Sequence, residues 1–451
     1  MDSKVKRMTT QPVEKLITRL AVPTIISMLV TTFYNMADTY FVSTMNNTSI
    51  TGAVGVVFSL MAIIQAFGFF FGHGSGNFIS RSMGAGDKRS SEIVASVGFF
   101  GAFIVGLLIM IFGLTFREPL AYMLGATDTI YPYAKEYMTY ILLGAPFMSA
   151  SIVINNQLRF QGNAGFAMVG ITSGAVVNCV LDPLLITAFK MGIKGAAIAT
   201  ITGQFVSFVL LLVGAYRSDN IKISIKNFIP KKEYVFAIVN GGFPSLCRQG
   251  IASVGTIYLH HTAGIYGDFA ITGMTVCSRV IMFFNSAMIG FGQGFQPVCG
   301  YNYGAKLYDR VSKAFWFCVK SSFIFLIVAS AIGFIFSEQI IGMFSKDAQV
   351  ISFGSATFRA MCTAFPLNSW IVMSNMTLQT TGKAVRASIL AAARQGIVLA
   401  PVIFIMNGLF GLDGLIFTQM TADIITFIIA IPFQSSFLKE IRMKVANSDN
   451  M

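Results

Sequence analysis

Long apolar segments recur along the whole chain and are separated by short polar stretches. Apolar runs that reach or exceed the ~20 residues a bilayer-spanning helix needs lie at positions 16–42, 52–80, 92–116, 131–156, 166–189, 195–216, 234–262, 270–298, 312–336, 351–378, 387–407 and 413–437. The pattern therefore predicts twelve transmembrane helices. Several runs exceed the required length, which predicts tilted or bent helices.

The composition supports an all-α integral membrane protein. Of the 451 residues, 55% are hydrophobic and 11% are charged, against about 25% charged residues in a soluble domain. Met1–Val13 is polar and basic, and the first apolar run is long enough to span, so no cleavable signal peptide is expected. The six cysteines lie in apolar segments without metal-type spacing, which predicts small core residues rather than disulfides. They are Cys179, Cys247, Cys277, Cys299, Cys318 and Cys362.

The net charge of +13 would suit nucleic-acid binding, but the positions of the basic residues indicate membrane topology instead. They gather at both termini and in alternate loops: Lys4, Lys6, Arg7, Arg81, Lys88, Arg89, Arg159, Arg217, Lys222, Lys226, Lys231, Lys232, Lys306, Arg310, Lys313, Lys383, Arg386, Lys439, Arg442 and Lys444. The intervening loops carry little beyond Arg117, Lys190, Lys194 and Lys346. Cytoplasmic loops are the ones enriched in Lys and Arg, so both termini are predicted to be cytoplasmic. Topology explains the charge, and no nucleic-acid partner is expected.

The second half of the chain repeats the first at an offset close to 220 residues. The pairs are Gly72 with Gly292, Gly74 with Gly294, Gly84 with Gly304, Ala85 with Ala305, Phe116 with Phe336, Glu118 with Glu338, Met123 with Met343, Pro146 with Pro366, Asn155 with Asn375, Gly162 with Gly382 and, one residue off, Pro23 with Pro244. Each half holds an even number of spans, so both insert the same way round and are related by an axis along the membrane normal. Many transporters share this plan, with the substrate path between the halves. We predict an N-terminal six-helix lobe at 1–221, a cytoplasmic linker at 222–232 and a C-terminal six-helix lobe at 233–451.

A polar cluster interrupts the fifth apolar run. Asn178 lies one helical turn before Asp182, so their side chains share a face, and Pro183 leaves the carbonyl of Cys179 without its usual donor. An aspartate near the centre of a span costs roughly 2.5–3.5 kcal/mol on insertion scales. A carboxylate, an amide and a freed carbonyl at one spot predict a site for a small cation, either a proton or a metal ion.

Two further spans supply polar groups. Asp38 lies deep in the first run; the alternative is a position near the outer helix end, solvated from that side. In the sixth run Ala196 and Thr200 are one turn apart, where small residues allow close helix approach and the hydroxyl offers an oxygen. A threonine in such a helix also commonly bonds back to its own backbone.

Comparison of the two repeats distinguishes the residues that both halves share from those that only one half has. The counterpart of Asp38 is Tyr258 or Leu259. The region that matches Asp182 and its proline is 399–402, Leu-Ala-Pro-Val, which keeps the proline and has no acid. The carboxylates belong to the N-terminal half alone, which favours an ion site over a packing role.

The other ionisable residues within apolar runs have several open roles. Arg248 and Gln249 follow the Pro244 bend of the seventh run, which suits either gating or substrate contact. The rest could line a path, pair with acids or extend to an interface, and for Arg279, Arg394 and Lys320 a structural role is favoured. The full set is Arg248, Arg279, Lys320, Arg359, Arg394 and Asp423. His73, His260 and His261 are too scattered for a metal site.

Together these features resemble the MATE (multidrug and toxic compound extrusion) family of transporters, in particular its MepA-like branch. The resemblance covers nearly the whole chain, and its specific marks are Asp38, the Asn178-x-x-x-Asp182-Pro183 motif, and Ala196 with Thr200. It implies that these residues form a cation-coupling site in the N-terminal lobe. It also implies that Asp38, Asn178 and Asp182 would be the metal ligands if the ion is sodium.

The resemblance also has a limit. Some members of the family carry acids in spans seven and ten, where this chain has Arg248, Gln249, Asn368 and Asn375. A second cation site is therefore not expected. These four residues and Asn35 become candidates for the substrate path or its gates.

The resemblance implies secondary active efflux of lipophilic, mostly cationic organic compounds in exchange for protons or sodium, by alternating access. It implies a monomer in the plasma membrane of a bacterium, in contact with drugs and the lipid bilayer. No enzyme activity is expected, and no cofactor is expected besides the coupling ion, H⁺ or Na⁺.

Three alternatives remain. A lipid-linked oligosaccharide flippase of the same broad superfamily would carry extra basic residues along its cavity and would not require Asp38, Asn178 and Asp182. An intramembrane enzyme acting on lipids needs a nucleophile–base pair or a metal cluster at the membrane face, and none stands out. A channel fits poorly with charged residues that break the repeat.

Overall fold

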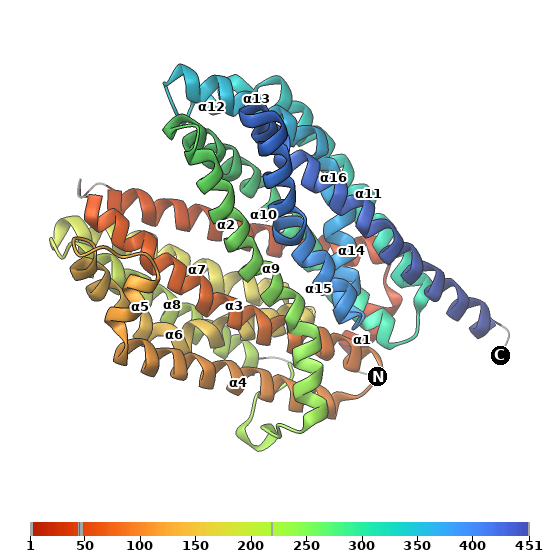
Figure 1. Cartoon of the computed structure of the whole chain (residues 1–451). Coiled ribbons are helices and arrows are strands. Elements are labelled where there is room, and N and C mark those ends of the chain that lie inside the picture. The colour runs from red at the N-terminus through yellow and green to blue at the C-terminus, as the bar shows by residue number, and fades with distance from the viewer. Residues whose placement is uncertain (1–2, 44, 46–47, 218–219, 450–451) are drawn as a thin grey trace.

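A computed structural model describes residues 3–43, 45, 48–217 and 220–449. This part of the chain is almost entirely helical and contains no β-strand, which confirms the all-α class (Figure 1). The N-terminal half comprises α1 (Ser3–Thr10), α2 (Val13–Ser43), α3 (Thr48–Gly84), α4 (Lys88–Thr115), α5 (Arg117–Met123), α6 (Tyr131–Phe160), α7 (Ala164–Pro183), the π-helix η1 (Leu184–Ala188) and α8 (Ile193–Tyr216). A short 3₁₀ turn, η2 (Ile225–Asn227), follows.

The C-terminal half repeats this order. It comprises α9 (Lys232–Gly264), α10 (Asp268–Gly304), α11 (Tyr308–Ile335), α12 (Ser337–Gly342), α13 (Ala348–Ala364), the 3₁₀ turn η3 (Phe365–Leu367), α14 (Asn368–Thr380), α15 (Ala384–Ala392), the π-helix η4 (Ala393–Ile397) and α16 (Leu399–Asp449). α16 is not one continuous rod, because Gly411, with a φ of 58°, breaks it into two parts, the second of which runs to the C-terminus (Figure 1).

Nine helical stretches of the described chain are long and apolar enough to cross a membrane, by length and composition. α9 is not among them and carries polar residues such as Arg248 and His260 along its length. α13 has 17 residues and continues through the Pro366 turn into α14. Counting α9, joining α13 to α14 and dividing α16 at Gly411 gives the twelve spans that the apolar pattern predicts.

The sequence repeat reappears as matching geometry. α3 and α10 begin and end 220 residues apart, and so do α4 and α11. Asn155 Nδ2 donates to the carbonyl of Ala167 at 2.9 Å, and Asn375 Nδ2 donates to the carbonyl of Ala387 at 2.7 Å. These equivalent bonds tie equivalent helices together in the two halves, so the repeat is structural.

The two halves are joined by their first two long helices. α2 packs against α10, and α9 packs against α3. Where α3 crosses α10, a Cβ added to Gly84 would overlap the Tyr301 carbonyl, and one added to Gly304 would overlap the Arg81 carbonyl. The two helices therefore cross with their backbones in contact, at positions that the repeat relates to each other.

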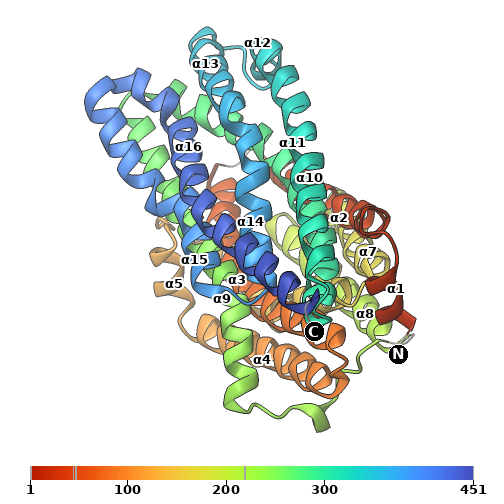
Figure 2. The same ribbon diagram turned by 90° about the vertical axis from the view of Figure 1, so that its right-hand side faces the viewer.

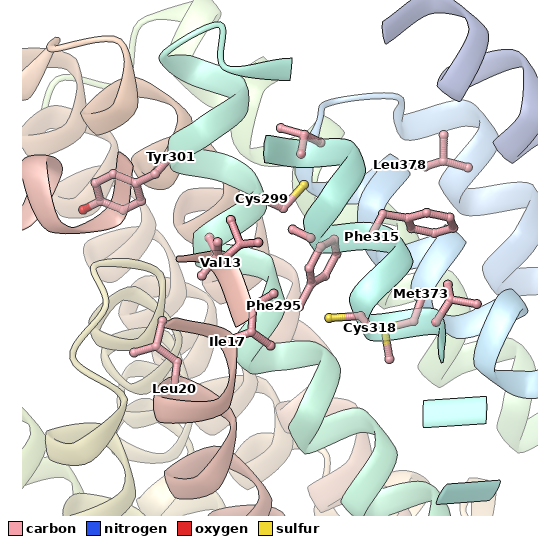
Figure 3. Packing of buried hydrophobic residues seen from close by; sticks show 14 of the residues in the cluster. Val13, Ile17, Leu20, Phe295, Cys299, Tyr301, Phe315, Cys318, Met373 and Leu378 are labelled. Atoms are coloured by element: carbon pink, nitrogen blue, oxygen red, sulfur yellow. The ribbon is translucent and has the colours of Figure 1, made fainter. Parts of the chain in front are cut away.

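A buried apolar cluster supports this junction near α1, and Figure 3 shows part of it. The labelled residues come from α2, α10, α11 and α14: Val13, Ile17, Leu20, Phe295, Cys299, Tyr301, Phe315, Cys318, Met373 and Leu378. Away from this cluster the two halves diverge. Figures 1 and 2 both show α5 of one half far from α12 of the other. All six cysteines have free thiols, as predicted.

Replacing Gly84 by alanine should destabilise the protein, because the added methyl group would meet the Tyr301 carbonyl at the α3–α10 crossing. Overpacking of this kind lowers the free energy of unfolding by about 1–3 kcal/mol, and the purified protein should show this as a lower melting temperature. Gly55→Ala is the matched control, since Gly55 lies in the same helix and a Cβ there has nothing within 4 Å. Equal melting temperatures for the two variants would contradict a close backbone crossing.

Candidate cation-binding site

The two acids predicted to act together do meet in the structure. Asp38 comes from α2 and Asp182 from the last turn of α7, and these helices pack against each other. The two carboxyl groups lie within hydrogen-bonding reach of each other. Asp182 is completely buried, and Asp38 is partly buried. Asp38 therefore belongs to the same site as Asp182.

The other predicted residues complete the surroundings of the pair. Asn178 Nδ2 donates to Thr200 Oγ1 of α8 at 3.4 Å, and both side chains are buried. Ala196 lies buried one turn before Thr200. The adjacent Gly195 packs directly on the backbone of Leu185, which allows α8 to approach η1 closely. The structure thus brings together side chains from α2, α7 and α8.

Two tyrosines belong to the site and were not predicted. The Tyr137 hydroxyl of α6 lies within hydrogen-bonding reach of Thr200, and Tyr137 also feels the charges of Asp38 and Asp182. Tyr34, one turn before Asp38, feels the same two charges and reaches Gln204. The four-residue spacing from Asp38 could have identified Tyr34. Tyr137 gives no such signal, because an aromatic residue in an apolar span is ordinary.

The site has more hydrogen-bond acceptors than donors. Within the described chain no hydrogen-bond donor reaches Asp38 Oδ1, Asn178 Oδ1 or either carboxylate oxygen of Asp182, and all four atoms are buried. Buried acceptors without partners are costly, and buried like charges are costlier still. A cation fits this arrangement: a shared proton would neutralise one acid, and a hard metal ion would take the oxygen ligands it prefers. Among the described residues, no three His, Cys, Asp or Glu side chains lie close enough together to hold a metal ion. A metal at this site would therefore also need the amide and hydroxyl oxygens as ligands.

Asp182 lies next to a change in helix type at the end of α7. Regular α-helix ends at Pro183, and the next five residues form the π-helix η1. Proline lacks the N–H that an α-helix needs at this point, so a change of hydrogen-bond pattern after Asp182 has a direct cause. The regular pattern of α7 therefore ends at the proline that the sequence marks, and a π-turn follows it.

A cavity of about 110 Å³ lies beside these residues in the N-terminal half, and we call it the N-half cavity. Its lining includes Asn35, Asn178 and Thr200 from the predicted set, together with Tyr34 and Gln204. The candidate path residue Asn35 thus faces the same space as the cation site.

The C-terminal half has a larger cavity of about 530 Å³, which we call the C-half cavity. Arg248, Gln249 and Asn375 line it. Leu259, one of the two residues that match Asp38, also lines it and is buried. The C-half cavity therefore lacks the counterpart of the carboxylate pair.

The acid that does line the C-half cavity is neutralised by its neighbours. Asp423 Oδ1 accepts from Arg394 Nε at 3.0 Å and from Gln419 Nε2 at 3.1 Å, while Oδ2 accepts from Asn368 Nδ2 at 3.1 Å. Asn368 is thus placed as a partner of Asp423. Arg359 pairs with Glu338 at 3.0 Å, and pairing with an acid is one of the roles that the sequence leaves open for it.

Comparison with known proteins identifies relatives over nearly the whole chain. The family model described as MatE matches residues 23–184 and 244–405, one match in each half. The multidrug export protein MepA of Staphylococcus saprophyticus is 28% identical over 406 residues, which cover 90% of each chain. A structure described as the outward-facing conformation of a multidrug resistance MATE family transporter of the MOP superfamily has a TM-score of 0.92 at 25% identity and covers 98% of this chain and 99% of that one.

A second solved structure is described differently. It is a MOP superfamily transporter from Pyrococcus furiosus for which reverse polarity of the binding pocket suggests a different function. It has a TM-score of 0.91 at 25% identity, and the match covers 98% of this chain and 99% of that one.

Replacing Asp182 by asparagine should raise the melting temperature of the purified protein at neutral pH. The substitution keeps the side-chain shape and removes one of two facing buried carboxyl groups that have no donors, a desolvation cost of roughly 1–3 kcal/mol. Asp268→Asn, at the exposed start of α10, is the matched control and should leave the melting temperature unchanged. A marked destabilisation by Asp182→Asn alone would show that the carboxylate is a structural anchor.

Proposed function

Because the chain belongs to the MatE family, we propose that it is a secondary active multidrug efflux transporter. It exports lipophilic, mostly cationic organic compounds in exchange for protons or sodium ions. The observation that carries this proposal is the Asp38–Asp182 pair, whose three buried carboxylate oxygens, together with Asn178 Oδ1, lack donors in the described chain. The family relatives named as multidrug export proteins support the substrate class.

The proposed exchange follows from the electrostatics of the pair. Two acids in contact inside a low-dielectric span cannot both stay ionised without a compensating cation, so they titrate as one coupled unit. When the pair is charged, it stabilises a cationic drug in the N-half cavity beside it. When it holds a proton or sodium ion, that stabilisation is lost. Binding of the coupling ion therefore weakens binding of the drug, and binding of the drug weakens binding of the ion by the same factor.

Substrate recognition would be loose. The N-half cavity combines hydroxyl and amide groups with Met28, Phe69 and Met148. Methionine side chains are flexible and polarisable, so they repack around ligands of different shapes. A single strong charge interaction and an adaptable apolar wall suit many lipophilic cations.

Alternating access requires the junction near α1 to open and the diverging ends to close. The polar contacts between the halves at this junction include three bonds: Arg81 donates to the Thr380 carbonyl, Arg159 donates to Gln293, and Asn302 Nδ2 donates to the Met8 carbonyl at 3.2 Å. These bonds would break in the opposite state. With the basic loops on the cytoplasmic side, the present state faces outward, and residues 222–232 form a cytoplasmic linker between two lobes.

Asp182→Asn should abolish export of ethidium from energised cells or vesicles, because a neutral amide can neither release the coupling cation nor compensate the drug. Asp38→Asn should act in the same way, whereas Asp268→Asn should export at the wild-type rate. Export is measured from ethidium fluorescence at matched protein levels. Wild-type export by Asp182→Asn would refute the ion-site assignment, and a wild-type protein that exports no ethidium would favour a lipid-linked oligosaccharide flippase.

The coupling ion can be identified with the wild-type protein in vesicles. Replacing sodium by choline at constant pH should stop ethidium transport if sodium is the coupling ion. A pH gradient should drive transport in choline if the proton is. Transport that persists in choline without any pH gradient would contradict both forms of exchange.

A further inference from the structure

The C-half cavity has the opposite polarity to the cation site. Three arginines line it, Arg248 from α9, Arg279 from α10 and Arg394 from η4, against one acid, Asp423. Asp423 is already occupied by Arg394 and two amide donors. Among the ion pairs of the described chain, none involves Arg248 or Arg279. Two guanidinium groups of the cavity wall are therefore without a counterion among the described residues.

These arginines lie deep in the membrane-spanning region. Arg248 is at the centre of the 33-residue helix α9. Arg279 is eleven residues from the start of α10, and Arg394 is ten residues from the start of α15, each roughly 15 Å along the helix at 1.5 Å per residue. Neither position is close enough to a helix end for simple solvation at the interface. Cations at such depth are costly and generally mark a ligand path, and within the described chain only Arg394 of the three is paired with an acid.

The repeat shows that the arginines are not part of the shared architecture. The position that matches Arg248, at the one-residue shift of Pro23 and Pro244, is Ser27. At the 220-residue offset between the starts of α7 and α15, the position that matches Arg394 is Gly174. Both Ser27 and Gly174 line the N-half cavity. Equivalent cavity walls are thus uncharged in one half and cationic in the other. The positive charge of these arginines is therefore specific to the C-terminal half and is not required by the shared fold.

We propose that the C-half cavity binds the anionic group of an amphipathic molecule, a carboxylate or a phosphate. Guanidinium groups bind both anions through paired, charge-assisted hydrogen bonds. The remaining lining is largely apolar and flexible, with Met282, Met361 and Met376, which suits a hydrocarbon or aromatic body. Asn285 Oδ1, buried on the same wall without a donor in the described chain, would accept from a polar group of the ligand. The cavity, about 530 Å³, is in the size range of sites for drug-sized ligands.

This site is independent of the proposed coupling at Asp38 and Asp182, so it extends the cargo from cations to anionic or zwitterionic compounds. The natural occupant is either a soluble organic acid or an anionic phospholipid from the bilayer, since both present the same chemistry. Direct binding to the purified full-length protein tests the site without any transport step.

The probe is dansylaminoundecanoic acid, compared with its methyl ester, which differs only by the charge. Fluorescence polarisation in nonionic detergent should show that wild type binds the acid at least about tenfold more tightly than the ester, the size expected for one charge-assisted contact. Arg248→Gln and Arg279→Gln should remove most of this preference, and Arg248→Lys should restore part of it. Lys320→Gln removes a charge from α11 outside the cavity lining and should keep the preference. Asp182→Asn should also keep it, which separates this site from the cation site.

Competition identifies the source of the anion. Displacement of the probe by phosphatidylglycerol and not by phosphatidylcholine would support the site with a lipid occupant, and no displacement by either would support it with a soluble organic acid. Equal affinity of wild type for acid and ester would overturn the proposal. An unchanged preference in both glutamine variants would overturn it as well. Size exclusion establishes folding, and if Arg248→Gln fails to fold, Arg279→Gln and Arg248→Lys decide the result.

Discussion

The close crossing of α3 and α10 is the constraint on which the rest of the molecule depends. Gly84 packs against the backbone at Tyr301, and Gly304 packs against the backbone at Arg81, so each contact is the repeat of the other. Two helices that touch in this symmetric way fix an axis between the halves. The pairings of α2 with α10 and of α9 with α3 then follow as one contact formed twice. A side chain at either glycine would push both pairings apart.

Upon this symmetric frame the charges are distributed asymmetrically. The N-terminal half holds a carboxylate pair with too few donors, and the C-terminal half holds guanidinium groups with too few carboxylates. Neither half neutralises itself, and the two sites occupy separate cavities. Since the backbone is shared, the difference lies in a few side chains, such as Ser27 against Arg248. The fold sets where the cavities are, and these side chains set what each can hold.

Much of this was predictable because its signals are local. Apolar length predicts spans, and the paired marks Gly162 and Gly382 recur because both adopt positive φ, near 80°, which favours glycine. The acids Asp38 and Asp182 stand out because a carboxylate in an apolar run is rare. Other features depend on the tertiary fold. Tyr137 joins the cation site through α6, and the π-turn η4 has no compositional mark of the kind that Pro183 gives to η1. The three cavity arginines are too distant in sequence for spacing to associate them.

The opposed polarity of the two cavities has an electrical consequence. The membrane potential contributes about 2.3 kcal/mol per elementary charge per 100 mV, and only for net charge moved. One proton entering for one monovalent cation leaving moves no net charge, so the potential gives no drive. A zwitterion leaving for one proton moves one positive charge inward, and a monovalent anion leaving for one proton moves the equivalent of two. A cargo held by the arginines of the C-half cavity therefore gains from the potential in a way that a cation held near Asp182 cannot. For each coupling ion exchanged, the membrane potential would therefore drive the two classes of compound with different force.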